Sequence, residues 1–550
     1  TGAQRRLLEN GVILSGLFGL LRPDDLIPNY RLKMSASVAE IGKVAAYWKP
    51  LVSKRLNELL KGQVVWNLLP GAHAAVWDNE ETYARMFKVK FYVEDENGER
   101  KAVTHGIKQL RGALVHHIVI ELPETLEDLD EWEAPDGYEV DFGFAEAPFS
   151  DLFQKAATSL ATRSQEFNII ISDSQWIGAL AEPGWILPMN DVISNSEQLS
   201  SIEWYSDTVP NTYMTYPDGS SDYWGLPQEG DTIALFLRKD MLTDPAEREA
   251  FESANGMPLP QTFEDFEALT MDDFEKVAAH FNRPDEQMWG TALQYSRVYD
   301  FCTCALYPFM WSQGGEIWDA ETGQVEGILN SEVNARGMEQ MKSWMQYQPP
   351  GRENFGIAEV IDVFSQGRVF SAFQWAAVGL AMITDEMKEN DQVMVVPPPK
   401  HGSGEEADRI YTMGGQPWVI NAFNDEEHMR VAMDFMDWWY LPETALEFAR
   451  RGGNPCDRAT LTRDDFDDIN PWNRAYKYML EPGVSRDFWH HPKYAEMLAV
   501  QQEAFSSYMT GQTEDAMQAL TYAACNQQQI LMDYGTAQNM PGGECSTIEL

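Results

Sequence analysis

Aromatic side chains stand beside planar polar side chains at several points in this sequence. Trp176 lies close to Asp173 and Gln175, and Trp224 lies a few residues before Glu229 and Asp231. Flat aromatic faces pack on the C–H patches of sugars and polyols, while carboxylates and amides bond pairs of hydroxyl groups. These residue types therefore favour binding of a polyhydroxylated small molecule. The candidate ligand-binding residues are Asp173, Gln175, Trp176, Trp224, Glu229, Asp231, Tyr307, Trp311, Gln374, Trp375, Gly414, Gly415, Arg451 and Asn454.

Each candidate also has a structural alternative. The chain holds 18 tryptophans, and any one of them can belong to the core instead of a ligand platform. Gly414 and Gly415 would let backbone N–H groups approach a ligand closely. Arg451 and Asn454 form a further candidate pair for a polar ligand group, although Arg451 is equally suited to a charge at a helix end.

Sequence motifs for catalysis, phosphate binding and metal binding are missing. There is no Gly-rich phosphate loop ending in Gly-Lys-Ser/Thr and no G-x-S-x-G nucleophile elbow. The adjacent pairs His116-His117 and His490-His491 lack the i, i+4 spacing that places two metal ligands on one helix face. The sequence therefore predicts no catalytic residue, no metal site and no cofactor.

The elements that would position these residues form an α/β pattern. Tyr138 to Phe144 is typical of a strand, and Ser150 can cap a following helix. The apolar run Asn168 to Ser172 then predicts a parallel strand that is buried on both faces. Ligands of open α/β sheets collect at the carboxyl ends of strands. Asp173 and its neighbours follow such an end.

Later segments repeat this pattern of short apolar runs and capped helices. Thr262 is a plausible helix cap, and Asn424 with Glu427 three residues later predicts the start of a methionine-lined helix. Pro442 can begin the next helix at its first position. The further predicted strands are Ile233 to Leu237, Val369 to Phe373, Val393 to Val396 and Trp418 to Ile420.

Composition limits the class of protein. The 550 residues carry a formal charge of −45, which would repel phosphate backbones, so we expect no nucleic-acid partner. No run of about 18 apolar residues would span a membrane, and we expect a soluble chain. Cys525 and Cys545 can pair if the compartment is oxidising, whereas Cys302 and Cys304 are more typical of buried small residues.

The N-terminal region differs from the rest. Residues 1–84 look like an appendage with helical periodicity over 38–60, and alternating residues up to Asn97-Gly98 predict a hairpin. The chain begins at Thr1, and we expect that a signal peptide has been removed.

Four segments carry a resemblance to the family 1 extracellular solute-binding proteins, the group that includes maltose-binding proteins. Their order and spacing over roughly residues 85–530 are specific, although the family's usual chain is shorter. The segments are 168–176 with 184–191, 224–240, 307–315, and 364–375 with 413–415 and the helix after Asn424.

The resemblance implies two hinge-linked α/β lobes, a type II periplasmic binding fold with an N-terminal helical extension. It implies a periplasmic, monomeric, non-enzymatic subunit that delivers a sugar or polyol to the permeases of an ABC importer. The alternatives are a cationic ligand such as a polyamine, or a secreted carbohydrate-active enzyme. The expected domains are an extension at 1–84, lobe one at 85–237 with 415–455, lobe two at 238–412, and helices packing across both at 456–550.

Overall fold

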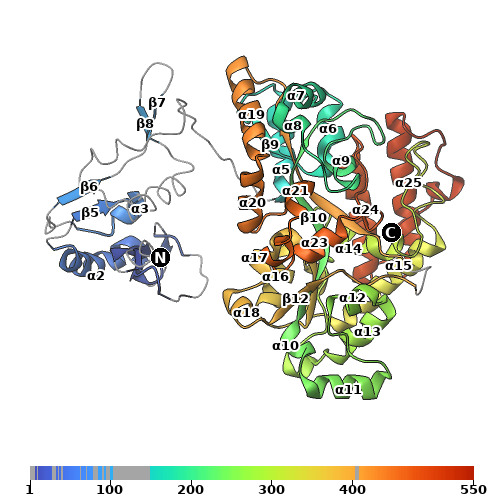
Figure 1. Ribbon diagram of the computed structural model, residues 1–550, viewed down its shortest axis with the longest axis horizontal. Helices are drawn as coiled ribbons and strands as arrows, with labels where there is room; N and C mark the ends of the chain where they lie inside the picture. The colour runs from blue at the N-terminus through green and yellow to red at the C-terminus, as the bar shows by residue number, and fades with distance from the viewer. Residues whose placement is uncertain are drawn as a thin grey trace. The chain divides into compact units, whose positions relative to one another are not determined.

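The computed structural model of the chain divides into two compact units, Thr1–Glu146 and Ala147–Leu550 (Figure 1). Each unit is described by itself. The residues that the structure describes are 7–8, 10–25, 27, 32–34, 36–38, 41–61, 64–69, 71–78, 85–88, 92–94, 100–102, 149–402 and 408–550. The predicted strand Tyr138 to Phe144 and the turn Asn97-Gly98 lie outside these residues.

The first unit combines helices with short two-stranded sheets. Helix α2 (Val44–Leu59) lies within the predicted helical region, and its buried positions Val52 and Leu56 share one face. The other described elements are α3 (Gly71–Ala74), β1 (Ile13–Ser15), β2 (Gly19–Leu21), β3 (Ser37–Val38), β4 (Gly42–Lys43), β5 (Val64–Asn67), β6 (Arg85–Lys88), β7 (Tyr92–Glu94) and β8 (Arg100–Ala102).

The extension ends later than the sequence pattern indicates. Strand β6 begins at Arg85 and pairs in parallel with β5, so the segment directly after residue 84 belongs to the first unit. Strands β7 and β8 pair antiparallel on either side of the predicted turn. The division at Glu146 therefore differs from the predicted one at residue 84, because strand pairing crosses that position.

The second unit is built on one six-stranded sheet surrounded by helices (Figure 1). Its strands are β9 (Ile169–Ile171), β10 (Leu226–Arg238), β11 (Ser371–Trp375), β12 (Val393–Val396), β13 (Tyr411–Ile420) and β14 (Ser485–Arg486). Its helices are α5 (Phe149–Ala161), α6 (Ile177–Ala181), α7 (Asn190–Asn195), α8 (Glu197–Ser200), α9 (Thr208–Tyr213), α10 (Lys239–Leu242), α11 (Pro245–Asn255), α12 (Phe263–Ala268), α13 (Met271–His280), α14 (Phe301–Trp311), α15 (Glu332–Ser343), α16 (Ile357–Ser365), α17 (Gly379–Met382), α18 (Asp385–Glu389), α19 (Glu426–Trp439), α20 (Pro442–Arg450), α21 (Arg458–Leu461), α22 (Phe466–Ile469), α23 (Asn473–Met479), α24 (Tyr494–Thr510) and α25 (Ala516–Tyr534).

Strand β10 connects two parts of this sheet. Its first half pairs antiparallel with β13, from Leu226 opposite Trp418 to Thr232 opposite Met413. Its second half pairs antiparallel with β11 and β12. Strand β13 likewise pairs with β10, β9 and β14 along its length. Each of these two long strands therefore connects two regions of the unit that pair with different strands.

Three local predictions need correction. The run Asn168 to Ser172 does form β9, but β9 pairs antiparallel with β13 instead of in parallel. Strand β9 lies at an edge of the sheet, and Ile171 is therefore 46% exposed instead of buried. Helix α19 is capped by Asp425, whose carboxylate accepts the N–H of His428 at 2.9 Å, while Asn424 bonds Asn168 instead. Strand β13 begins before Pro417, not after it: Pro417 lies opposite Pro227, where the pairing register shifts and no ladder N–H is required.

Other local predictions are confirmed. Thr262 caps α12 in a capping box, and Pro442 occupies the first turn of α20. Cys302 and Cys304 are buried, and Cys525 and Cys545 form a disulfide. No described helix is both long and apolar enough to cross a membrane.

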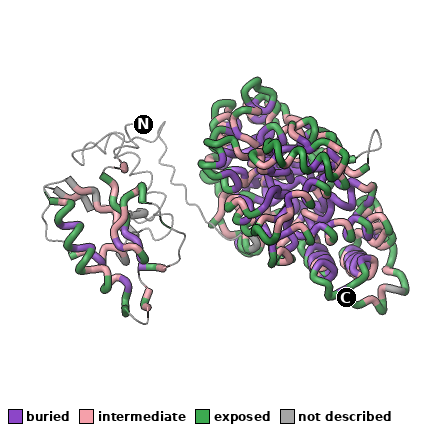
Figure 2. The backbone as a smooth tube through the Cα atoms, turned by 90° about the horizontal axis from the view of Figure 1, so that it is seen from below, coloured by how far each residue is buried: buried purple, intermediate pink, exposed green. Residues whose placement is uncertain are grey.

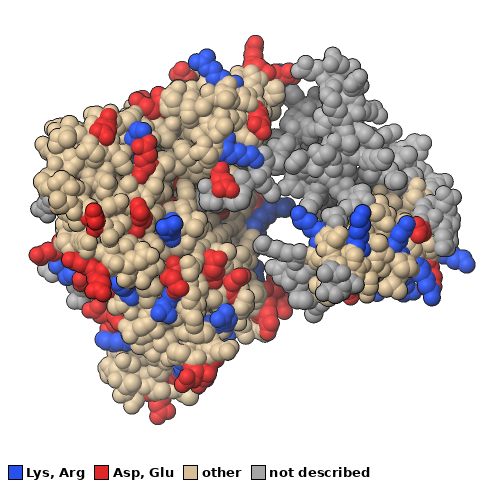
Figure 3. Space-filling model, turned by 180° about the vertical axis from the view of Figure 1, so that it is seen from behind, with Lys and Arg blue, Asp and Glu red and all other residues tan. Residues whose placement is uncertain are grey.

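The interior of the second unit is mainly apolar, although Asp173, Asp231 and Asp300 are buried in it as well. Buried residues fill its interior, and exposed residues lie on its outer turns and helix faces (Figure 2). On the face in Figure 3, Asp and Glu side chains are scattered over the unit and mixed with Lys and Arg. The acidic excess on this face is therefore spread out, as expected for a charge that serves solubility.

Candidate ligand-binding site

Asp173 is at the centre of a buried polar cluster that joins distant parts of the second unit. It follows β9 directly and precedes the short 3-10 helix Ser174–Trp176. Its side chain accepts hydrogen bonds from the hydroxyls of Tyr299 at 2.7 Å and Ser174 at 3.2 Å. The indole N–H of Trp176 donates to the same Tyr299 hydroxyl at 2.7 Å. The loop after β9 therefore contacts the segment before α14 through a shared tyrosine.

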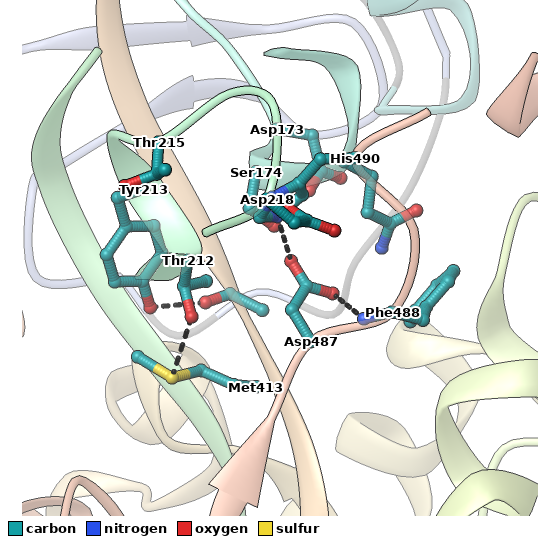
Figure 4. Close-up of polar contacts among 12 residues, drawn as sticks. Asp173, Ser174, Thr212, Tyr213, Thr215, Asp218, Met413, Asp487, Phe488 and His490 are labelled. Carbon is teal, nitrogen blue, oxygen red and sulfur yellow. Dashed lines mark hydrogen bonds and ion pairs between the residues drawn. The ribbon is translucent and has the colours of Figure 1, made fainter. Parts of the chain in front are cut away.

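Two further carboxyl groups join this cluster. Gln175 donates to Asp300 at 3.1 Å, and Asp300 precedes α14. Asp487 follows β14 and pairs with His490 at 3.5 Å, while His490 also bonds Asp218 at 2.7 Å. In Figure 4, Asp173, Ser174, Asp218 and His490 lie together, and Asp487 points toward them.

Burial controls the ionisation of these groups. Burial and the nearby carboxyl of Asp300 raise the pKa of Asp173 above its ordinary value, and burial likewise raises the pKa of Asp300. Burial alone would lower the pKa of His490, but the carboxyls of Asp218 and Asp487 outweigh it and raise that pKa to about 10. At neutral pH His490 is therefore a cation within an acidic cluster.

A second group of candidates lies where β10 and β13 cross. Asp231 is opposite Gly414, and the Trp375 ring packs so closely on Gly414 that a Cβ atom there would lie 2.9 Å from it. The Asp231 carboxylate accepts the backbone N–H of Ala377 at 2.9 Å. Burial raises the pKa of Asp231 well above its usual range and that of Glu229 to about 7.

Asn454 belongs to this crossing group. Its carbonyl accepts the N–H of Gly230 at 2.9 Å, and its side-chain oxygen accepts the Trp472 indole N–H at 3.1 Å. Its fully buried side-chain nitrogen has no hydrogen-bond partner. A buried donor without a partner costs about 1–3 kcal/mol, so this amide is suited to a ligand acceptor.

The remaining candidates lie apart from either group or inside the core. Tyr307 and Trp311 are buried in α14, where the Tyr307 hydroxyl donates to Gln501 and the Arg486 guanidinium stacks 4.3 Å over the Trp311 ring. Gln374 accepts from Gln294, and Trp224 donates its indole N–H to Tyr216. Arg451 is exposed and pairs with Glu447 one helical turn earlier, as a helix-end charge does.

The sequence pattern did not single out five members of the Asp173 cluster: Asp218, Tyr299, Asp300, Asp487 and His490. None of them directly follows a strand that the sequence predicts. The adjacent pair His490-His491 stands out in the sequence, but its spacing is evidence only against a metal site. The one usable signal was the aromatic run Phe488-Trp489 next to Asp487.

Comparison with known proteins agrees with this architecture. The family model of the bacterial extracellular solute-binding proteins matches residues 122–446, more than half of the chain. The chain belongs to this family. The predicted family resemblance is therefore confirmed.

Solved structures of solute-binding proteins share the two-lobed fold. The ribitol complex of an ABC transporter solute-binding protein from Agrobacterium radiobacter has a TM-score of 0.58 at 18% identity, over 70% of this chain and 90% of that one. Maltose-bound MalE3 of T. maritima has a TM-score of 0.57 at 19% identity, over 70% and 89% of the two chains. Identities this low show the fold alone, and that fold is the predicted α/β type II architecture.

The first unit is similar to a different family. The family model described as peroxide stress protein YaaA matches residues 1–142. A UPF0246 protein of Flavobacterium johnsoniae is 35% identical over 136 residues, which is 24% of this chain and 52% of that protein. The chain thus spans about half the length of the curated relatives it matches in this region.

Proposed function

We propose that the second unit captures a sugar or polyol between its two lobes and delivers it to the permease subunits of an ABC importer. The ligand would contact the Asp173 cluster and the crossing group of Glu229, Asp231, Gly414 and Asn454. Trp176 and Trp375 would supply flat faces beside these polar groups. The protein would bind its ligand without turning it over.

One observation carries this proposal. Side chains that are distant in sequence converge in a buried site that retains hydrogen-bonding atoms without partners. Tyr299 joins the loop after β9 to the segment before α14, and the oxygen Oε1 of the buried Gln175 bonds nothing. Buried polar atoms are normally satisfied, so unsatisfied ones at a junction of segments favour a missing polar ligand.

The solved relatives support the ligand class. Solved structures of solute-binding proteins with this fold hold ribitol, maltose, alpha-D-tagatose or D-mannitol. All four are polyhydroxylated and uncharged. A site with carboxyl groups, amides and aromatic faces has the chemistry to bind such compounds.

A periplasmic location is part of the proposal. Members of the matched family are extracellular solute-binding proteins, and the disulfide between Cys525 and Cys545 requires an oxidising compartment to form and persist. We expect a monomer that closes its lobes about strands β10 and β13 when the ligand binds.

The test is a ligand screen on the full chain followed by calorimetric titration. A sugar or polyol that binds the folded state will raise the unfolding midpoint of the second unit. Asp173→Asn should weaken the binding of that ligand at least tenfold, whereas the exposed-helix control Asp434→Asn should leave it unchanged. Chromatography of oligosaccharides after incubation should reveal no products, and turnover would contradict the proposal.

A further inference from the structure

The Asp173 cluster holds more buried carboxyl groups than its own cations can pair. The carboxyl groups of Asp173, Asp300 and Asp487 are almost completely buried and come from three separate segments. Within the described part of the chain, the one ion pair that any of them makes joins Asp487 to His490. His490 divides its single charge between Asp487 and Asp218. Asp173 and Asp300 are thus left without a cationic partner among the described side chains.

The cluster also retains a buried hydrogen-bond acceptor without a partner. Tyr299 and Ser174 each give one hydrogen bond to Asp173, and Gln175 gives one to Asp300. The oxygen Oε1 of Gln175 is buried and accepts no hydrogen bond, while Oδ2 of Asp487 lies 3.5 Å from Nε2 of His490 in an ion pair. Gln175 is only 2% exposed, and its amide already bonds Asp300, so the free oxygen lies at the cluster itself. The Gln175 oxygen is therefore an unpaired acceptor at the site.

Aromatic rings border the same carboxyl groups. Trp176 packs edge-on against Tyr299, with ring centroids 6.5 Å apart, and Phe153 packs on both Trp176 and Tyr494. Carboxylates beside aromatic rings are suited to an ammonium group, which gains from the charge and from the ring faces. A neutral hydroxyl supplies one donor and no charge, whereas an ammonium supplies three donors and one positive charge.

We propose that the hydroxylated ligand carries a protonated amino group, as in an amino sugar or amino-polyol, and that this group binds between Asp173 and Asp300 beside Tyr299. This inference rests on the proposed function and specifies its ligand class. The oxygen of Gln175 would accept a further ammonium hydrogen, and the ligand hydroxyls would extend toward the crossing group.

The experiment uses matched compounds that differ only in one amino group. D-Glucosamine is compared with D-glucose, and 1-amino-1-deoxy-D-sorbitol with D-sorbitol, by unfolding midpoint and calorimetric titration on the full chain. Putrescine serves as an amine without hydroxyls. We expect at least one amino compound to bind at least tenfold more tightly than its parent. Asp300→Asn should reduce that ratio toward one, and Asp434→Asn should leave it unchanged.

Proton release provides a second readout that does not depend on the folding of a variant. The groups that face the amino site are the carboxyls of Asp173, Asp300 and Asp487, the cation His490, the hydroxyls of Tyr299 and Tyr494, and the thiol of Cys304. Burial and mutual repulsion raise the pKa values of Asp173 and Asp300, so an ammonium that binds them must displace protons. Its affinity should rise as pH increases through about 6 and toward about 8, the pKa values of Asp300 and Asp173, and the binding heat should depend on the ionisation enthalpy of the buffer.

The outcomes separate the two proposals. Tighter binding of an amino compound with proton release supports the inference. If neutral parents bind as tightly as their amino partners, or no amino compound binds, the inference fails while the sugar or polyol function stands on the neutral ligands. If putrescine binds and every hydroxylated compound fails, both the inference and the proposed function are overturned.

Discussion

At the scale of single residues, burial decides which chemistry the candidate side chains retain. Asp173 and Asp231 are almost inaccessible to solvent and accept hydrogen bonds from neighbouring donors. Arg451 is also a candidate by its sequence, but its side chain is exposed to solvent. A carboxyl group in a buried environment holds its proton to higher pH, which makes its charge responsive to a ligand. The environment of the side chain, more than its type, therefore separates site residues from surface residues.

Glu229 gives a pH prediction at this scale. Burial raises the pKa of Glu229 to about 7 from its ordinary value near 4.5. Because the folded state then binds this proton more tightly than the unfolded state, the contribution to stability is full below about pH 4.5 and is lost as pH rises through about 7. The free energy of unfolding should therefore fall by on the order of 1–3 kcal/mol between pH 5 and pH 8, and Glu229→Gln should remove this fall.

Urea unfolding at both pH values measures this effect. The expected result is a smaller fall in the free energy of unfolding for Glu229→Gln than for the unchanged chain. The exposed Glu443, converted to Gln, is the control and should leave the fall unaltered. Equal falls for Glu229→Gln and the unchanged chain would show that Glu229 titrates normally.

At the scale of elements, the crossing of β10 and β13 positions part of the proposed site. The two strands approach so closely that Gly414 faces the Trp375 ring and Gly415 takes a positive φ of +107°. A Cβ atom on Gly415 would lie 2.5 Å from the carbonyl oxygen of Glu229. The glycine pair thus permits the strand contact that places Glu229 and Asp231 together.

Gly415→Ala tests this role. The substitution adds a clash with strand backbone to an unfavourable φ, and we expect a loss of about 2–4 kcal/mol in the free energy of unfolding. Gly184→Ala is the matched control, since Gly184 also has a positive φ (+71°) but no atom within 4 Å of an added Cβ. It should cost only about 1 kcal/mol. Equal losses for the two variants would exclude a special constraint at the crossing.

At the scale of the whole molecule, the chain joins two units that match different families. Residues 1–102 hold 15 Lys and Arg against 12 Asp and Glu, whereas the complete chain holds 41 against 86. The acidic excess therefore belongs to the rest of the chain. Each unit has its own described hydrophobic core, so each can unfold as a cooperative body.

Calorimetry of the full chain should therefore resolve two unfolding transitions. A ligand at 100 times its dissociation constant stabilises the state that binds it by about 2.7 kcal/mol. We expect the saturating sugar, polyol or amino compound to shift only the transition of the second unit. A reducing agent that opens the disulfide between Cys525 and Cys545 should lower that same transition. A single transition, or equal shifts of both, would contradict independent units.

Elements whose cause is local could be predicted from the sequence. The cap at Thr262, the strand Val393–Val396 and the proline at the start of α20 follow from residues within one turn or strand. The family resemblance likewise rested on short segments in order. Asp173, Gln175 and Trp176 were found because they follow an apolar run directly, and Glu229 with Asp231 because Trp224 precedes them.

Which of these residues meet depends on how the whole chain folds. Asp173 and Tyr299 are 126 positions apart, and Gln175 and Asp300 are 125 apart, so no local pattern could pair them. The direction of β9 depends on the whole fold as well, because its partner β13 lies far along the chain and runs the opposite way. Side-chain types, caps and short periodicities are local properties, whereas burial and charge balance depend on the whole fold. For that reason the sequence supplied candidate ligand residues, and the fold selected the cluster around Asp173.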